Sequence, residues 1–208
     1  MRIIYRWSQP MDPYRVFFPL GLAFAIGGSL LWIVSYYGSL AVWPSVLHVD
    51  WMMSGFMVAY VLGFQMTAIP RLTGTPTASS FEILLPALPL TIGGLVSLTF
   101  PEIRPVLLAG CFALCTIVPF ALKRFKHRKH PVPSSFVFLA VGIGAGISGS
   151  AILFTGVFNE FSYSSPNIGA FLLYRMMVPA IVLGIGSQLI PYLFGTQTTL
   201  IPENATSA

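Results

Sequence analysis

Four side chains near two apolar segments have types and spacings that could support chemistry: His48, Asp50, Met52 and Arg175. His48 and Met52 are four residues apart, so they share one face of a helix. An imidazole and a thioether are a familiar axial pair for haem iron. One helical turn cannot supply ligands to both faces of a haem, however. A haem held by His48 would therefore take its other axial ligand from another helix or another chain.

The same residues also suit copper. Imidazole and thioether groups are copper ligands, and Asp50 lies between them in the sequence, so His48, Asp50 and Met52 could form a compact metal site. The structural alternative is a His48 that is hydrogen-bonded at the membrane surface and binds no metal. Cys111 and Cys115 are also four apart and could bind copper as thiolates, although thiols in an apolar segment are usually packing residues.

Arg175 is the one charged residue inside the last apolar segment. A charge within a membrane span is costly unless it is paired, which makes Arg175 a candidate functional residue. Its guanidinium offers paired donors to a planar anion, so its partner could be Asp50, a haem propionate or an anionic substrate. In the alternative interpretation Arg175 extends to the outer headgroups and has no specific partner.

Membrane helices must position these residues, because the chain is too apolar for a water-soluble fold. It has 208 residues, of which 55% are hydrophobic and 8% are charged. A soluble domain usually has about a quarter of its residues charged. This composition excludes a soluble enzyme, a nucleic-acid-binding domain and a disordered chain. No nucleophile–base pair or carboxylate dyad is evident, which disfavours hydrolysis, and the sequence does not decide whether the protein is an enzyme.

Six segments are long and apolar enough to cross a bilayer core, which takes about 20 helical residues. They are continuously apolar and lack the alternation of barrel strands. We therefore predict an all-α polytopic integral membrane protein with six transmembrane helices in one membrane domain over residues 1–208. The predicted spans are 16–38, 51–70, 83–101, 105–122, 136–158 and about 169–194.

Basic residues predict the orientation. With the amino terminus inside, nine Lys and Arg residues fall on the inner side and two, Arg104 and Arg175, on the outer side. Cytoplasmic loops carry such an excess, so both termini are predicted to be cytoplasmic. The basic run Lys123–His130 is expected to contact anionic lipid headgroups of the bilayer, and no nucleic acid.

Two pairs of segments are related in sequence. Val61–Thr75 matches Val182–Thr196 at eight of fifteen positions without gaps, with an offset of 121. Val16–Ser29 matches Val137–Ser150 at the same offset. We therefore predict that helices 1–2 and 5–6 are parallel repeats. One and a half copies of a four-helix unit also suggest a partner, either a second copy in a homo-oligomer or a larger membrane complex.

Three stretches resemble the NnrS family of bacterial membrane proteins: DPYRVFFPLGLAFA (Asp12–Ala25), LHVDWMMSGFMVAYVLGFQMTAIPRLTGTP (Leu47–Pro76) and GIGSQLIPYLFG (Gly184–Gly195). The second stretch carries most of the resemblance. Its positions that fit the family pattern are His48, Met52, Gly55, Phe56, Gly63, Phe64, Thr67, Ala68, Pro70, Thr73 and Gly74. Two features depart from the pattern: the family's H-x-H pair is reduced to His48 followed by Asp50, and Trp51 replaces a glutamate. The chain is also about half the usual length of family members.

The resemblance implies a multi-pass protein of the bacterial inner membrane, containing haem b, copper or both, and linked to nitric-oxide stress. Together with the position of Arg175 inside a span, the resemblance leads us to expect the cofactor near His48, Met52 and Arg175. Two alternatives stay open: a cofactor-free structural or assembly subunit of a larger membrane complex, and a small-solute carrier or channel with Arg175 facing an anion.

Overall fold

The computed structural model describes residues 12–38, 44–130, 134–158 and 165–194. Within these ranges every regular element is a helix, which confirms the all-α prediction. The elements are α1 (Tyr14–Tyr36), α2 (Pro44–Asp50), the π-helix η1 (Trp51–Met57), α3 (Val58–Thr73), α4 (Ser80–Ser97), the 3-10 turn η2 (Pro101–Ile103), α5 (Pro105–Lys126), α6 (Phe136–Phe158), α7 (Ser165–Ala170), the π-helix η3 (Phe171–Met176) and α8 (Met177–Leu193).

Six of these helical stretches within the described residues are long and apolar enough to cross a membrane, as the sequence predicts. Most helix ends differ from the predicted spans by one to four residues, and two differences matter for the site described below. The second span begins at Pro44 rather than at residue 51, so His48 and Asp50 lie inside the helix. The third helix ends at Ser97 rather than at residue 101, because Pro101 begins the separate turn η2.

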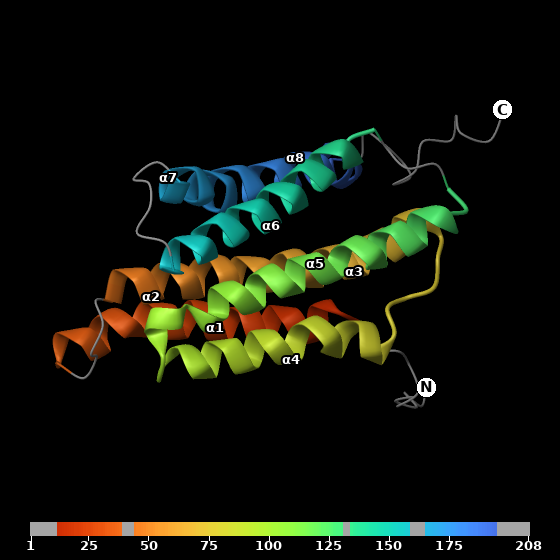
Figure 1. Cartoon of the computed structure of the whole chain (residues 1–208). Helices are drawn as coiled ribbons and strands as arrows, with labels where there is room; N and C mark the ends of the chain where they lie inside the picture. Colours follow the sequence, from red (N-terminus) through yellow and green to blue (C-terminus); the bar gives the residue numbers. More distant parts are fainter. Residues whose placement is uncertain (1–11, 39–43, 131–133, 159–164, 195–208) are drawn as a thin grey trace, which may run out of the picture.

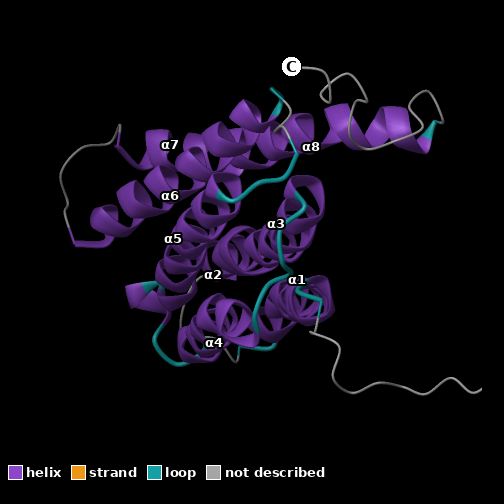
Figure 2. Cartoon of the chain, turned by 90° about the vertical axis from the view of Figure 1, so that its right-hand side faces the viewer, coloured by secondary structure: helices purple, strands orange, loops and turns teal. Residues whose placement is uncertain are grey.

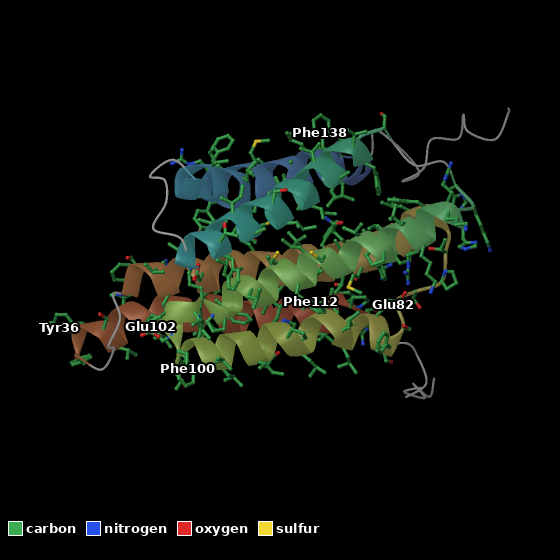
Figure 3. The ribbon with its side chains drawn as sticks, in the orientation of Figure 1. Tyr36, Glu82, Phe100, Glu102, Phe112 and Phe138 are labelled. Carbon is green, nitrogen blue, oxygen red and sulfur yellow. The ribbon has the colours of Figure 1, made fainter. Side chains whose placement is uncertain are left out.

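The helices form three layers of two, with α1 and α4 in the first, α3 and α5 in the second, and α6 and α8 in the third (Figures 1 and 2). Large apolar side chains such as Leu88, Ile92 and Val182 are exposed on the outside of the bundle. Phe112 is likewise exposed, and Phe138 extends away from the bundle (Figure 3). A water-soluble monomer rarely exposes so much apolar surface, and lipid is the solvent that suits it.

Local sequence signals explain where several helices begin and end. Ser79 caps α4 in a capping box: its hydroxyl accepts from the Glu82 backbone N–H, and the Glu82 carboxylate accepts from the Ser79 N–H at 2.9 Å. Gly74 ends α3 with a positive φ of 66°, which glycine adopts readily. Arg124 of α5 then donates to both oxygens of Glu82, at 2.9 and 3.1 Å, and so ties α5 to α4.

The ends of the bundle differ in charge. Arg15, Arg71 and the segment Lys123–Lys129 belong to the end at which α1 and α4 begin, here called the basic end. Tyr36 and Glu102 lie at the opposite end, here called the Asp50 end, and Glu82 at the basic end (Figure 3). The described part of the chain therefore groups its basic residues as the sequence predicts. Both termini lie outside the described residues, and the membrane side that each end faces stays a prediction.

Equivalent contacts occur in the two hairpins that the sequence predicts to be repeats. A Cβ added at Gly21 would meet Tyr60 and the carbonyl of Phe56, and one added at Gly142 would meet Ile181 and the carbonyl of Met177. All three pairs of positions differ by 121. In addition, the π-helices η1 and η3 occupy corresponding places, and α1 runs parallel to α6 (Figure 1). These contacts support the predicted repeat, whose last residue, Thr196, lies outside the described residues.

Candidate functional site

The candidate site lies where α2 passes into η1, at the Asp50 end of the bundle. The helix continues through this junction with helical backbone angles at Asp50. Residues two apart on a helix point in different directions, whereas residues four apart share a face. Accordingly, His48 and Met52 face α1, and Asp50 faces α5.

His48 is held against α1 by one hydrogen bond. Its Nδ1 lies 2.8 Å from the carbonyl oxygen of Gly28, and its ring lies 5.7 Å from that of Trp32, centroid to centroid. A carbonyl oxygen can only accept, so Nδ1 carries the proton and donates. In the neutral ring this leaves the Nε2 lone pair available. A backbone carbonyl that fixes the opposite nitrogen is the usual support of a metal-binding histidine.

Met52 lies over the same glycine. A Cβ added at Gly28 would be 3.3 Å from the sulfur of Met52 and 3.3 Å from Cβ of Trp51. The absence of a side chain at Gly28 thus lets both His48 and Met52 approach the backbone of α1. The structure brings these two predicted site residues to one surface, as their spacing predicts.

Asp50 forms a buried ion pair with Arg104 of the η2–α5 junction. Nε of Arg104 donates to Oδ2 of Asp50 at 2.8 Å, and Nη2 donates to Oδ1. The Asp50 side chain is 2% exposed and that of Arg104 16% exposed. Tyr174 of η3 lies in the electrostatic neighbourhood of Asp50 and Arg104. Both oxygens of Asp50 are therefore engaged, and they face away from Met52 and His48.

Arg104 reaches Asp50 through an unusual backbone conformation. Its φ of 47° and ψ of 55° are left-handed, and among the described residues it is the one non-glycine residue with a positive φ. That conformation costs an ordinary residue roughly 1–2 kcal/mol. It lets Arg104 turn the chain between η2 and α5, with Pro105 as the first residue of α5. The ion pair stabilises the strained turn.

Arg175 is exposed on η3, and no hydrogen bond or ion pair joins it to another residue in the described ranges. Its neighbour Tyr174 is the residue of η3 that turns toward Asp50. The sequence suggests Arg175 as a possible partner for Asp50. In the structure, the partner of Asp50 is Arg104 instead. The Cys111 sulfur lies 3.8 Å from the Ile147 carbonyl oxygen, and Cys115 is exposed.

Sequence reasoning missed Arg104, Tyr174 and Gly28 as site residues. Arg104 was assigned to an outer loop, and the pair it forms spans 54 positions of the chain. Pro105 directly after it signals a helix start and could have drawn attention to Arg104. No local pattern points to Tyr174.

Comparison with known proteins identifies the family. The family model described as NnrS protein matches residues 11–206, nearly the whole chain. The chain belongs to the NnrS family. Neither the search of curated proteins nor the search of solved structures found a match. Family membership thus agrees with the resemblance seen in the sequence, and with the six membrane-spanning helices.

The donor atoms of this NnrS-family chain fit copper better than they fit an enclosed haem. His48 Nε2 and the thioether of Met52 lie on one surface, and they are a nitrogen and a sulfur ligand of the kinds that copper prefers. His48 alone could serve as an axial ligand to haem iron. No group of three or more His, Cys, Asp and Glu side chains gathers among the described residues in a way that could hold a metal.

Proposed function

We propose that this NnrS-family membrane protein binds copper through His48 Nε2 and Met52 Sδ at the Asp50 end, and acts in the response to nitric oxide. The observation that carries the proposal is the hydrogen bond from His48 Nδ1 to the Gly28 carbonyl. It fixes the tautomer in which Nε2 can bind a metal. Haem b held axially by His48 is the second cofactor that this imidazole supports.

Asp50 has a different role in this proposal. Both oxygens of its carboxylate accept hydrogen bonds from the guanidinium of Arg104, which leaves His48 and Met52 as the proposed ligands from this chain. A pair of ligands on a helix surface is half of a copper site, and a partner chain or a small molecule completes it. The Asp50–Arg104 pair fixes the α2–η1 helix that carries both ligands, and so positions them.

Metal content and absorption of the purified protein test the proposal. We expect His48→Ala to lower copper affinity more than about tenfold, and Met52→Leu to lower it less, since imidazole binds more strongly than a thioether. His127→Ala is the matched control, because His127 is exposed at the basic end. Competition with a chromogenic copper(I) chelator measures the affinity of each variant. Equal affinity in wild type and His48→Ala would rule out the copper site.

An absorption spectrum of the same preparation separates the two cofactors. A Soret band that is present in wild type and His127→Ala but absent in His48→Ala identifies haem bound at His48. A colourless protein that also fails to bind copper would favour a cofactor-free subunit of a larger complex. A carrier would additionally have to move an anion across a liposome membrane.

The membrane setting of the proposal follows from charge. We propose that the protein lies in the bacterial inner membrane with its basic end facing the cytoplasm, since cytoplasmic loops carry the excess of Lys and Arg. His48 and Met52 would then lie on the periplasmic side. Nitric oxide is small and apolar, and it could reach that surface from the lipid as well as from water.

A further inference from the structure

A groove at the basic end opens between the first hairpin, α1 with α3, and the last hairpin, α6 with α8. Its cavity volume is about 300 Å³. The ends of α1, α3 and α8 that border it lie along one side of the bundle (Figure 2). Aromatic and aliphatic side chains line most of its length, among them Phe18, Phe64, Phe136 and Ile185. The groove is far from His48 and independent of the proposed copper site.

The groove has the depth of one membrane leaflet. Along α3 it extends from Gly63 to Arg71, which is about 12 Å at the helical rise per residue. Half of a bilayer core is about 15 Å. At the deep end Gly63 packs tightly against α1, where an added Cβ would come within 2.9 Å of Phe17. Tyr14 and Arg71 lie at the mouth, at the level where helix ends meet the membrane surface.

Positive charge surrounds the mouth of the groove. The Arg71 side chain is 63% exposed, and its ion-pair partner among the described residues, Asp12, is 3.7 Å away. That distance exceeds the 2.7–2.9 Å of a charge-assisted hydrogen bond, so the Arg71 donors can serve a second anion. The backbone N–H of Lys129 donates to the Thr73 carbonyl at 2.8 Å, which brings the basic α5–α6 connection beside this mouth. Arg71 and Arg15 share Asp12 as an ion-pair partner at this mouth, each at 3.7 Å.

We propose that the groove binds an anionic phospholipid, with one acyl chain between the two hairpins and the phosphate at Arg71. The lining is apolar along its length except for Thr67, whose hydroxyl donates to the Gly63 carbonyl, and its charge lies at the mouth, which matches a lipid tail that ends in a charged headgroup. A zwitterionic lipid would satisfy the apolar groove but not the excess of positive charge. A bound acyl chain would fill the space between the two hairpins and hold them together.

Native mass spectrometry of the full-length protein tests this assignment with two lipids of identical chains, phosphatidylglycerol and phosphatidylcholine. We expect wild type to retain one phosphatidylglycerol and to bind phosphatidylcholine at least about tenfold more weakly. Arg71→Gln should lower phosphatidylglycerol binding to the level of phosphatidylcholine. Lys126→Gln is the matched control, because Lys126 is an exposed cation at the same end that does not line the groove.

A second variant tests the apolar part of the groove. Ala68→Phe places a ring in the groove and should abolish binding of both lipids, while circular dichroism and the melting temperature report whether the protein is folded. The proposal is overturned if Arg71→Gln and Lys126→Gln behave alike, if both lipids bind equally to wild type, or if folded Ala68→Phe retains phosphatidylglycerol. It is also overturned if the groove is found covered by a second copy of the chain.

Discussion

The Asp50–Arg104 pair shows how a charged residue can be tolerated inside a membrane helix. Asp50 is almost fully buried, and a lone buried carboxylate would cost several kcal/mol. The guanidinium satisfies both oxygens with two parallel donors, a geometry that lysine cannot provide. The pair links the second membrane span to the turn that begins α5.

Removal of one partner of this pair should destabilise the protein strongly. We expect Asp50→Asn or Arg104→Gln to lower the free energy of unfolding by about 3–5 kcal/mol, because each leaves an unpaired buried charge. The double variant Asp50→Asn/Arg104→Gln should lose less than the sum of the two single changes, because the second change no longer breaks a pair. Unfolding of the detergent-purified protein, followed by tryptophan fluorescence, measures all three.

Glu102→Gln is the control for this cycle, since Glu102 is exposed beside Arg104 and should change stability by less than about 0.5 kcal/mol. Additive losses in the double variant would show that Asp50 and Arg104 do not act as a pair. A loss in Glu102→Gln as large as in Arg104→Gln would point to the η2 turn instead.

Glycines set the distances between helices in both hairpins. Gly28 lies under His48 and Met52, and Gly149, 121 positions later, lies under Gly169 and Leu173. Close approach of backbones is the main source of helix association in lipid, where burial of apolar surface gains little. The second hairpin keeps the glycine but has Gly169 and Leu173 where the first has His48 and Met52. The close approach of the two helices at this glycine is thus common to both hairpins, whereas the candidate ligands His48 and Met52 occur only in the first.

Two glycines of α6 provide a matched test of this packing. A Cβ at Gly149 would lie 2.6 Å from the backbone nitrogen of Leu173, whereas a Cβ at Gly144 would meet nothing within 4 Å. We expect Gly149→Ala to lower the free energy of unfolding by about 1–3 kcal/mol. Gly144→Ala should leave it unchanged or raise it by up to about 1 kcal/mol, because alanine favours the helix.

The melting temperature of each variant in the same detergent checks this contrast. Equal behaviour of the two variants would mean that α6 and η3 are not in close contact at Gly149. The corresponding change in the first hairpin, Gly28→Ala, should also weaken copper binding, since it disturbs the surface on which His48 and Met52 lie.

Sequence reasoning predicted the elements better than the contacts between them. Continuous apolar runs fix the six helices because each must cross the same thickness of lipid. The shared face of His48 and Met52 also follows from local spacing. The partner of Asp50 does not, because Arg104 is distant in sequence and reaches it only through a left-handed turn. The start of the second span at Pro44 was missed because residues 44–50 are less apolar than those that follow.

Across the whole molecule, the first hairpin (α1 with α3) is covered by other helices to a greater extent than the last hairpin (α6 with α8). In the first hairpin, Ser54 of η1 packs against Gly110 of α5, and Ala23 of α1 lines a groove between α1 and α4. The positions 121 residues later are Arg175, which is exposed, and Gly144, which has open space around it. In the first hairpin, α4 and α5 cover the surface formed by α1 and η1. The corresponding surface of the second hairpin, formed by α6 and η3, is therefore uncovered in the described part of the chain. The exposed Arg175 on this surface suits a partner that supplies a carboxylate.

We predict that a second chain covers this surface in the membrane, either another copy or a different subunit. A cysteine placed at position 175, in a protein whose Cys111 and Cys115 are replaced by alanine, should be captured by a short bismaleimide in native membranes. A product of twice the chain mass identifies a homo-oligomer, and another mass identifies a larger complex. Leu88→Cys, an exposed position on α4, is the control and should give little product.

Arg175→Leu should release the partner if the guanidinium is paired, because a carboxylate left alone at this depth loses its counter-ion. A chain that stays monomeric in membranes, with Arg175→Leu indistinguishable from wild type, would instead mean that Arg175 extends to the headgroups and that lipid covers this face.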